Sequence, residues 1–339
     1  MAALPMGLAQ MLAVADDEDA TGRRSAAAAD ELVRHFQHQY RFTFEGLIGR
    51  GVFGATFRIV EKLQHGASRR LAVKRALEPY GYRSLRREIT MLQYLRGSAH
   101  IANLVAWRDD PAPVNIRGLR RLRRFVHRGY EGAAQAALVG LANPVMVLEY
   151  LSNGDMGRLY DRALAHNILL PNRVLWSFFL CSMLGDEGGK FPEHAEVPIV
   201  KLIDFGQATV PQGFGNGSPE NIYRAARIIV NLICRRGEGG DVTTHWQGRE
   251  TRAGRILPDA AGNNPFPTLD PWLRDLLAEC MAREWHRRPD LRTAIERAEI
   301  GARMPPAAYT FPPGALARET PEYIRAVLKT LVYDADPNA

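Results

Sequence analysis

Hydrophobic residues follow two different patterns in two parts of the chain. β-Branched and aromatic residues surround glycines in FTFEGLIGRGVFGATFRIVEK, and a similar stretch, RRLAVKRAL, follows. This texture predicts two strands joined by a glycine-rich turn, and then a third strand. IANLVAW and PVMVLEYL predict two further buried strands. Between the third and fourth strands, SLRREITMLQYLRG places Leu85, Ile89, Leu92 and Leu95 at helical spacing.

From residue 152 onward the patterns are mostly helical. The predicted helices are NRVLWSFFLC, SPENIYRAARIIVNLICRR, LDPWLRDLLAECMAREW, RPDLRTAIERAEIG and TPEYIRAVLKTLVYD, the last with Thr320 as cap and Pro321 at its first position. One strand-like stretch, PIVKLIDFG, interrupts them. Residues 1–40 predict an Ala-rich tail with a short helix capped by Ser25. A β-rich part followed by a helical part indicates an α+β fold with two lobes.

The composition is typical of a soluble globular protein. Of the 339 residues, 46% are hydrophobic and 24% are charged. No apolar stretch reaches the roughly 18–20 residues that span a bilayer. The N-terminus has no basic region before its apolar residues, so we expect no secretory signal and a cytoplasmic or nuclear location. Cys181, Cys234 and Cys280 are widely spaced, match no metal-binding pattern and are expected to be reduced thiols.

An arginine-rich stretch lies between the fourth and fifth predicted strands. Residues 108–130 carry Arg108, Arg117, Arg120, Arg121, Arg123, Arg124 and Arg128 against Asp109 and Asp110. One interpretation is a solvated, partly helical insertion, and the other is a docking patch for an acidic protein, phosphate groups or nucleic acid. No interleaved aromatic platform or nucleic-acid motif supports the last of these partners. The net charge of +7 favours anionic partners only weakly.

Three groups of residues in the β-rich part suggest phosphate chemistry. Gly49, Gly51 and Gly54 form a GxGxxG pattern, but the strand-like ATFRIV follows it rather than the helix of a dinucleotide-binding fingerprint. The glycines therefore predict a hairpin tip that can fold over phosphates, or else a plain tight turn. Lys74 lies in LAVK and Glu88 on the next predicted helix. A buried cation that holds phosphates needs such an anionic partner.

Two more groups extend this set. VMVLEYL is an apolar strand that ends in Glu149 and Tyr150, where backbone amides and carbonyls can pair with an adenine edge. Asp204 follows the predicted strand VKLI and precedes Phe205 and Gly206, a position suited to holding magnesium on phosphates. In this order, the groups resemble the eukaryotic protein-kinase family over about residues 41–300. CMAREWHRRPDL resembles the closing helix pair of that family, with Arg288 at its structural arginine.

The resemblance implies a site and an activity. It implies that Lys74 binds the α- and β-phosphates of ATP, that Glu88 orients Lys74, and that Asp204 binds magnesium, one ion at most. Leu148 would guard the back of the adenine pocket. The full set of ATP-site residues that we expect is Gly49, Gly51, Gly54, Ala72, Lys74, Glu88, Leu148, Glu149 and Leu151. By family, the reaction is phosphoryl transfer from Mg-ATP to a protein Ser/Thr hydroxyl.

The catalytic loop of the family is missing. An H-R-D-L-x-x-x-N loop, whose Asp is the base and whose Asn holds a second metal, normally precedes the DFG strand. Here the interval is NRVLWSFFLCSMLGDEGGKFPEHAEVPIVKLID, and no Asn follows Asn172 in it. NRVLWSFFLC resembles the front half of the family's long helix, about three turns, and MLGD resembles the strand after the loop. The sequence therefore predicts a block deleted between Cys181 and Met183, with no catalytic residue.

Two nearby features bear on activity. Asp186, Glu187, Glu193, His194 and Glu196 could supply a substitute base or form a solvated acidic loop, and by family analogy their turn lies away from the γ-phosphate. Only QATVPQGFGNGSPE separates the DFG motif from the next helix. Its Ser218-Pro219-Glu220 imitates the A-P-E of the family, but we interpret it as a helix start. Such a short segment, with Thr209 and Ser218 as its phosphorylatable residues, leaves little room for docking a peptide.

Three hypotheses follow. The chain is an internally deleted form of an active kinase, which we favour because decay normally substitutes residues without removing a block. Alternatively, it is a genuine pseudokinase that binds nucleotide as a scaffold or allosteric partner, or an interaction module that uses residues 108–130. The expected domains are a tail at 1–40, an N-lobe at 41–151 with the insertion at about 108–143, a C-lobe at 152–300, and a C-terminal extension with a helix at 301–339.

Overall fold

The chain folds into two compact units, and each is described by itself. The computed structural model describes residues 6–51, 54–109, 132–141, 144–183, 197–208, 217–235, 241–308 and 315–334. Unit 1 comprises Met1–Gly97, Ile101–Tyr150 and Ile203–Val210, and unit 2 comprises Ser98–His100, Leu151–Leu202 and Pro211–Ala339. Unit 1 contains a five-stranded sheet, and most helices belong to unit 2. The expected mixed fold class, β-rich first and helical second, is confirmed.

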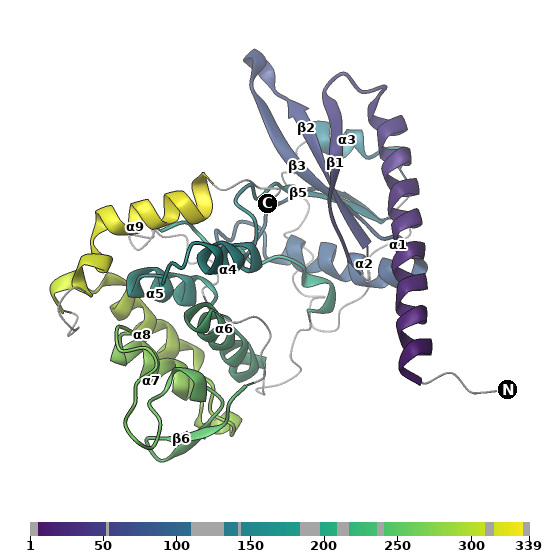
Figure 1. The fold of residues 1–339 in the computed structure, drawn as a ribbon. Coiled ribbons are helices and arrows are strands. Elements are labelled where there is room, and N and C mark those ends of the chain that lie inside the picture. The colour runs from purple at the N-terminus through teal and green to yellow at the C-terminus, as the bar shows by residue number, and fades with distance from the viewer. Residues whose placement is uncertain are drawn as a thin grey trace. The chain divides into compact units, whose positions relative to one another are not determined.

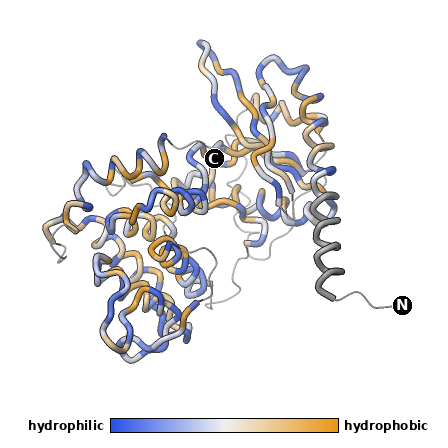
Figure 2. Tube along the Cα trace, in the orientation of Figure 1, coloured by the Kyte–Doolittle hydropathy of each residue, from blue (hydrophilic) through white to orange (hydrophobic). Residues whose placement is uncertain are grey.

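Unit 1 is built on an antiparallel sheet with the strand order β1-β2-β3-β5-β4 (Figure 1). Its strands are β1 (Phe42–Gly51), β2 (Gly54–Lys62), β3 (Ser68–Arg75), β4 (Leu104–Arg108) and β5 (Val145–Glu149). All five were predicted from the sequence. The polar run KLQHGASRR forms the tip between β2 and β3, which is hydrophilic in Figure 2. Apolar side chains lie nearer the middle of these strands, where helices cover them.

Helices cover both faces of this sheet. Helix α2 (Pro79–Tyr94) packs on one face, where Leu85, Ile89 and Leu92 join buried residues of β3 and β5. Helix α1 (Met6–Phe36) and the short helix α3 (Gly132–Ala137) pack on the other face, against residues such as Phe57 and Val73. Alternate residues of a strand point to opposite faces, and β3, β4 and β5 contribute buried residues to both cores, whereas the buried apolar residues of β1 and β2 belong to the core under α1.

The N-terminal helix is longer than the sequence predicted. We expected a short helix capped by Ser25, but α1 runs from Met6 to Phe36, and Ser25 lies inside it. The Ser25 hydroxyl donates to the Gly22 carbonyl within the helix (2.8 Å), so it is not available as an N-cap. The alanine-rich stretch before Ser25 contains no proline after Pro5 to stop the helix. Ser25, Ala28, Leu32 and Phe36 form its buried stripe.

Unit 2 consists mainly of helices around one apolar core. They are α4 (Met156–Ala165), α5 (Asn172–Cys181), α6 (Gly217–Cys234), α7 (Pro271–Cys280), α8 (Leu291–Arg303) and α9 (Pro321–Leu328). The described part of the unit also contains a small hairpin, β6 (Thr244–Trp246) with β7 (Arg249–Thr251), and several single-turn helices, of which Lys329–Tyr333 directly follows α9. Thr320 accepts a hydrogen bond from the Tyr323 amide (3.3 Å), which confirms the predicted cap of α9.

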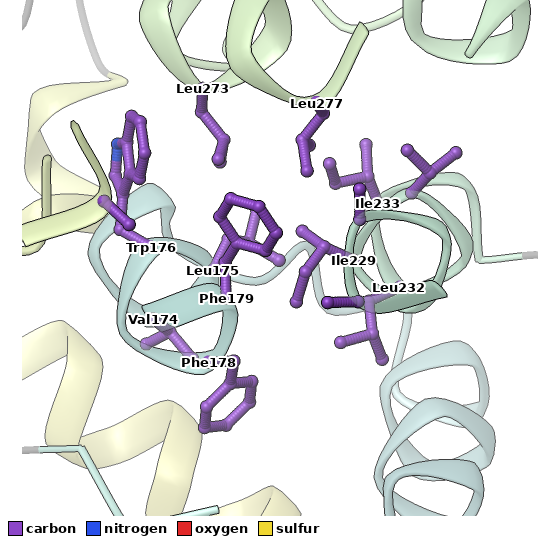
Figure 3. Close-up of a cluster of buried hydrophobic side chains, with 14 of the residues drawn as sticks. Val174, Leu175, Trp176, Phe178, Phe179, Ile229, Leu232, Ile233, Leu273 and Leu277 are labelled. Carbon is purple, nitrogen blue, oxygen red and sulfur yellow. The ribbon is translucent and has the colours of Figure 1, made fainter. Parts of the chain in front are cut away.

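Helix α5 is the centre of this core (Figure 3). It has ten residues and ends at Cys181, in agreement with the predicted length of about three turns. Every residue in it except Arg173 is buried, and Phe179 lies among side chains of α6 and α7. The α8 backbone also comes close, because a Cβ added at Gly301 would lie 2.3 Å from the Trp176 ring.

The stretch PIVKLIDFG does not form the predicted strand. Residues 197–204 have no strand assignment among the described residues, although the Leu202 amide donates to the His100 carbonyl (2.8 Å). Three of its apolar side chains, Ile199, Leu202 and Ile203, are exposed. Strand formation needs a partner for the backbone and cover for the apolar face, and the described structure provides little of either.

Candidate functional site

Lys74 connects two acidic residues in unit 1. Its Nζ donates to Glu88 Oε2 (2.7 Å) and to Asp204 Oδ1 (3.0 Å). The Lys74 side chain is 19% exposed, Glu88 is 2% exposed and Asp204 is 66% exposed. The ammonium group is therefore held from the buried side by Glu88, while the Asp204 carboxylate faces solvent.

The strand and helix patterns explain why Lys74 and Glu88 meet. Lys74 has the same parity on β3 as Ala72, so both side chains point to the face that α2 covers. Glu88 lies on α2 one residue before the buried Ile89, which directs it to the edge of that apolar contact. The two residues predicted to pair are thus brought together, as the order of the motifs required.

Burial and the neighbouring groups have opposite effects on the pKa of the Glu88 carboxyl group. Burial raises its pKa above the usual value, because loss of water disfavours the charged form. The positive charge and hydrogen bond of Lys74 act in the opposite direction, and so does the backbone N–H of Phe205. Removing Lys74 would leave this buried carboxyl without its main compensating charge.

Asp204 lies at a strained turn close to α2. Its backbone is left-handed, with φ 64° and ψ 68°, a region that aspartate tolerates better than most residues. Phe205, the first residue of the short helix η5 (Phe205–Gln207), packs against the apolar cluster under α2. Gly206 touches α2, since a Cβ there would fall 2.2 Å from Ser84 Oγ. These contacts fix the position of the exposed carboxylate.

The glycine-rich motif forms the end of the β1–β2 hairpin, as predicted. Gly51 is opposite Gly54 in the register, and residues 52 and 53 lie outside the described residues. Gly54 is required by the close approach of β3, because a Cβ there would fall 2.2 Å from the Arg75 carbonyl oxygen. Gly49 and Gly51 have open space around them. One glycine is thus structural, and the other two leave room beside the hairpin.

The residues expected around an adenine lie on neighbouring strands. Ala72 of β3 and Leu148 of β5 are register partners, and both are buried. Glu149 is anchored to the next segment, since its backbone N–H donates to the Asn103 carbonyl (3.0 Å) and its carboxylate accepts from the Asn103 amide (2.7 Å). Leu151 follows this strand and is the first residue of its segment of unit 2.

The donor set at Asp204 fits one magnesium ion held largely by phosphates. Among the described residues, no group of three or more His, Cys, Asp or Glu side chains could hold a metal. Magnesium commonly takes one or two carboxylates and completes its octahedron with phosphate oxygens and water. An exposed carboxylate 3.0 Å from a lysine ammonium is consistent with that mode of binding.

In unit 2, two predicted landmarks are in contact. Helix α6 begins at Gly217, so the interpretation of Ser218-Pro219-Glu220 as a helix start is confirmed, although Ser218 lies within the first turn rather than before it. Arg288 donates to the Pro219 carbonyl (2.9 Å) and reaches Glu220 (3.5 Å). Thr209 and the acidic stretch from Asp186 to Glu196 lie outside the described residues.

Sequence reasoning missed two features of this site. The direct contact of Lys74 with Asp204 joins residues 130 positions apart, and no local pattern encodes that pairing. The role of Gly54 in admitting the β3 backbone was also missed. A glycine that precedes a strand and faces an adjacent strand end is the signal that could have revealed it.

Comparison with known proteins gives a distant relationship. No family model matches the chain. The chain is similar to a calcium-dependent protein kinase. Calcium-dependent protein kinase 27 of Oryza sativa subsp. japonica is 23% identical to it over an alignment of 273 residues, which covers 71% of this chain. The aligned region is 39% of the relative, so the chain spans well under half of that protein's length.

The similarity and the fold together indicate a protein kinase relationship. Such a relationship implies a nucleotide as partner and, in general, ATP with Mg²⁺. The described helices also include none with the length and apolar character needed to cross a membrane.

Proposed function

We propose that the chain is a protein kinase-like protein that binds Mg-ATP at Lys74, Glu88 and Asp204 and does not transfer the phosphoryl group. The single observation that carries this proposal is the position of Lys74 Nζ, 2.7 Å from Glu88 and 3.0 Å from Asp204. A cation held between a buried and an exposed carboxylate is suited to receive phosphate oxygens while its partner keeps it in place.

Each residue has a separate part in binding. Lys74 would neutralise the α- and β-phosphates, and Glu88 would keep its ammonium group directed at them. Asp204 would hold one magnesium ion, which bridges phosphate oxygens and offsets their charge when bound. Gly49 and Gly51 leave the hairpin end free of side chains, so its backbone can approach phosphates.

The absence of transfer follows from the sequence between Asn172 and Asp204. That interval contains no Asp or His followed at the family's loop spacing by an Asn. A general base contributes about 10²–10⁴ in rate, and loss of a second metal ligand lowers the rate further. We therefore expect nucleotide binding without turnover.

We favour an internal deletion as the origin of this chain. The exposed Ile199, Leu202 and Ile203 support it, since an apolar stretch predicted as a buried strand has lost its cover. The alternative is a genuine pseudokinase that binds nucleotide as a scaffold or allosteric partner. The burial of Cys181 and Met183 supports that alternative, because the junction closes without exposing its own apolar side chains.

Binding is tested by titrating the purified chain with Mg-ATP in a calorimeter. Lys74→Met and Asp204→Asn should each weaken binding about 10- to 100-fold, as expected for loss of a charge-assisted contact of about 1.5–3 kcal/mol. Lys62→Met, which changes an exposed lysine of the same sheet, should bind like the unmodified chain. Thermal melting should accompany each titration, because Lys74→Met leaves Glu88 buried and unpaired.

Three results would contradict the proposal. The claim that the chain binds nucleotide at this site would be wrong if the unmodified, folded chain failed to bind Mg-ATP. It would also be wrong if Asp204→Asn bound Mg-ATP with the same affinity as the unmodified chain. The claim that the chain is inactive would be wrong if the unmodified chain transferred a phosphoryl group to a protein and the Lys74→Met variant did not.

The two origins are separated at the junction itself. The native transcript and the tryptic peptide Val174–Lys190 should be sequenced. Extra codons between Cys181 and Met183 that encode an Asp and an Asn at the loop spacing would establish the deletion and make the natural protein an active kinase. A peptide in which Ser182 alone separates Cys181 from Met183 would favour the pseudokinase, and the Mg-ATP titration would then be the decisive experiment.

A further inference from the structure

Helix α1 contacts three elements of the proposed nucleotide site from the opposite face of the sheet. Its buried residues Ala28, Leu32 and Phe36 pack on the apolar face of the sheet. Figure 1 shows the helix running along the sheet, with its C-terminal half beside β1. Its polar side chains reach past this apolar contact to β3 and to the start of α2, and Arg50 of the glycine-rich hairpin reaches the α1 backbone at Gly22.

The contact with β3 is adjacent to Lys74. Glu31 of α1 forms an ion pair with Arg75 (2.9 Å), whose side chain is largely buried. Arg75 and Lys74 are consecutive on the strand, so they point to opposite faces. The ion pair that holds Arg75 on the α1 face therefore also restrains the backbone of the adjacent Lys74, whose side chain lies on the other face.

The contact with α2 is at the start of that helix. Arg24 forms an ion pair with Glu78, the residue that precedes α2. Helix α2 is continuous from Pro79 to Tyr94, so its N-terminus and Glu88 move together. Holding Glu78 thus limits how far Glu88 can move from Lys74.

The contact with the glycine-rich hairpin involves Arg50, which lies between Gly49 and Gly51. A Cβ added at Gly22 would fall only 2.9 Å from Arg50 Nη1, so the arginine side chain lies against the α1 backbone there. Near the C-terminal end of α1, His35 Nε2 lies 2.6 Å from the Ala137 carbonyl oxygen of α3. These contacts hold the C-terminal half of the helix, from Gly22 to His35, along the sheet.

We propose that α1 is a positioning element for Lys74, in which the Glu31–Arg75 and Arg24–Glu78 ion pairs hold β3 and α2 so that Lys74 and Glu88 stay paired. Glu31 and Arg24 are positioning residues, since they act through Arg75 and Glu78. The inference rests on the proposed nucleotide site, but it also predicts a property of the protein without nucleotide. Lys74 should be protected from chemical modification only while these two ion pairs hold α1 in place.

The test uses the full chain and an amine-acylating reagent, with the modification of each lysine followed by peptide mass spectrometry. The rate at Lys74 is divided by the rate at the exposed Lys62, which corrects for differences in reagent concentration. Loss of one partly buried ion pair should raise this ratio about three- to tenfold in Glu31→Gln and in Arg24→Glu. Asp30→Asn, an equal charge change at the exposed neighbour of Glu31, should leave the ratio unchanged.

A charge exchange separates positioning from a general loss of stability. Adding Glu78→Arg to Arg24→Glu restores an opposite pair and should return the Lys74 ratio to that of the unmodified chain, whereas a merely disturbed helix would not recover. The affinity for Mg-ATP should fall and recover in parallel. An unchanged Lys74 ratio in both Glu31→Gln and Arg24→Glu would overturn the proposal.

The two proposals fail in different ways. If the unmodified chain does not bind Mg-ATP but the Lys74 ratio follows the variants as expected, the nucleotide site is wrong and the positioning role stands. If the unmodified chain binds Mg-ATP and the variants match it in both affinity and Lys74 ratio, the nucleotide site stands and the positioning role is wrong.

Discussion

At the scale of single residues, the proposed site depends on opposing effects at Glu88. Burial destabilises its charged form, and Lys74 together with the Phe205 amide stabilises it. Burial has the larger effect, so the pKa of Glu88 is raised. The folded protein therefore holds a proton on this carboxyl at a pH where the unfolded chain has released it.

This raised pKa predicts how stability changes with pH. The stability that Glu88 contributes is fully present below its ordinary pKa, about 4.3, and is lost as pH rises through the raised folded value. The Glu88→Gln variant has no carboxyl group at this position, so it does not lose this stability as pH rises. Between acid and neutral pH, its free energy of unfolding should therefore rise relative to that of the unmodified chain, by about 1.4 kcal/mol for each unit by which the pKa of Glu88 is raised.

Denaturant unfolding of both proteins at several pH values measures this effect. Glu296→Gln, an exposed glutamate on α8, serves as the control and should keep a constant difference from the unmodified chain. A Glu88→Gln difference that stayed constant, or that moved in favour of the unmodified chain as pH rose, would show that the pKa of Glu88 is not raised.

At the scale of elements, local pattern was sufficient wherever an element is completed by its own neighbours in sequence. Strands β1, β2 and β3 form consecutive hairpins, and α2 has a clear apolar stripe, so all four were predictable. The pairing of Lys74 with Glu88 followed from their order and the family resemblance. The contact with Asp204 did not, because it depends on where a distant segment returns to the sheet.

Two elements were predicted incorrectly for identifiable reasons. Ser25 has the chemistry of a cap, but its hydroxyl bonds within α1, and the upstream residues continue the helix. The segment 197–204 has the composition of a buried strand, but in the described structure it forms only a single bridge, at Leu202. Propensity describes what a segment favours, and the presence of a partner decides whether it forms.

The exposure of that segment can be tested by substitution. Ile203 is 55% exposed, so Ile203→Lys should change the free energy of unfolding by no more than about 0.5 kcal/mol. Leu180→Lys, at a fully buried position of α5, should cost more than about 4 kcal/mol or prevent folding. Denaturant unfolding of both variants gives the comparison. A large cost at Ile203 would mean that the segment is covered, and would remove the main structural support for a deletion.

At the scale of the whole molecule, positive charge is unevenly distributed. Residues 110–131 hold six arginines against one aspartate and one glutamate, a net +4 of the total +7. These residues lie outside the described structure, but the flanking Asp109 and Gly132 line one pocket of unit 1. The nucleotide proposal leaves this charge unused, so an acidic protein partner remains a separate proposal.

If this arginine-rich stretch binds an acidic partner, position should matter as well as charge. The chain should bind a labelled polyglutamate peptide at low salt, and replacing the six arginines with glutamine should weaken binding at least about tenfold.

The control variant replaces six exposed arginines elsewhere, which are Arg34, Arg96, Arg224, Arg283, Arg287 and Arg292. Both variants have the same net charge. Fluorescence anisotropy at increasing salt should show a steep dependence of binding for the unmodified chain and the control, and a shallow one for the first variant. Salt screens charge attraction, and only the unmodified chain and the control keep the arginines that attract the peptide. Equal weakening in both variants would mean that the peptide responds to net charge alone, and the arginine-rich stretch would then be only a solvated insertion.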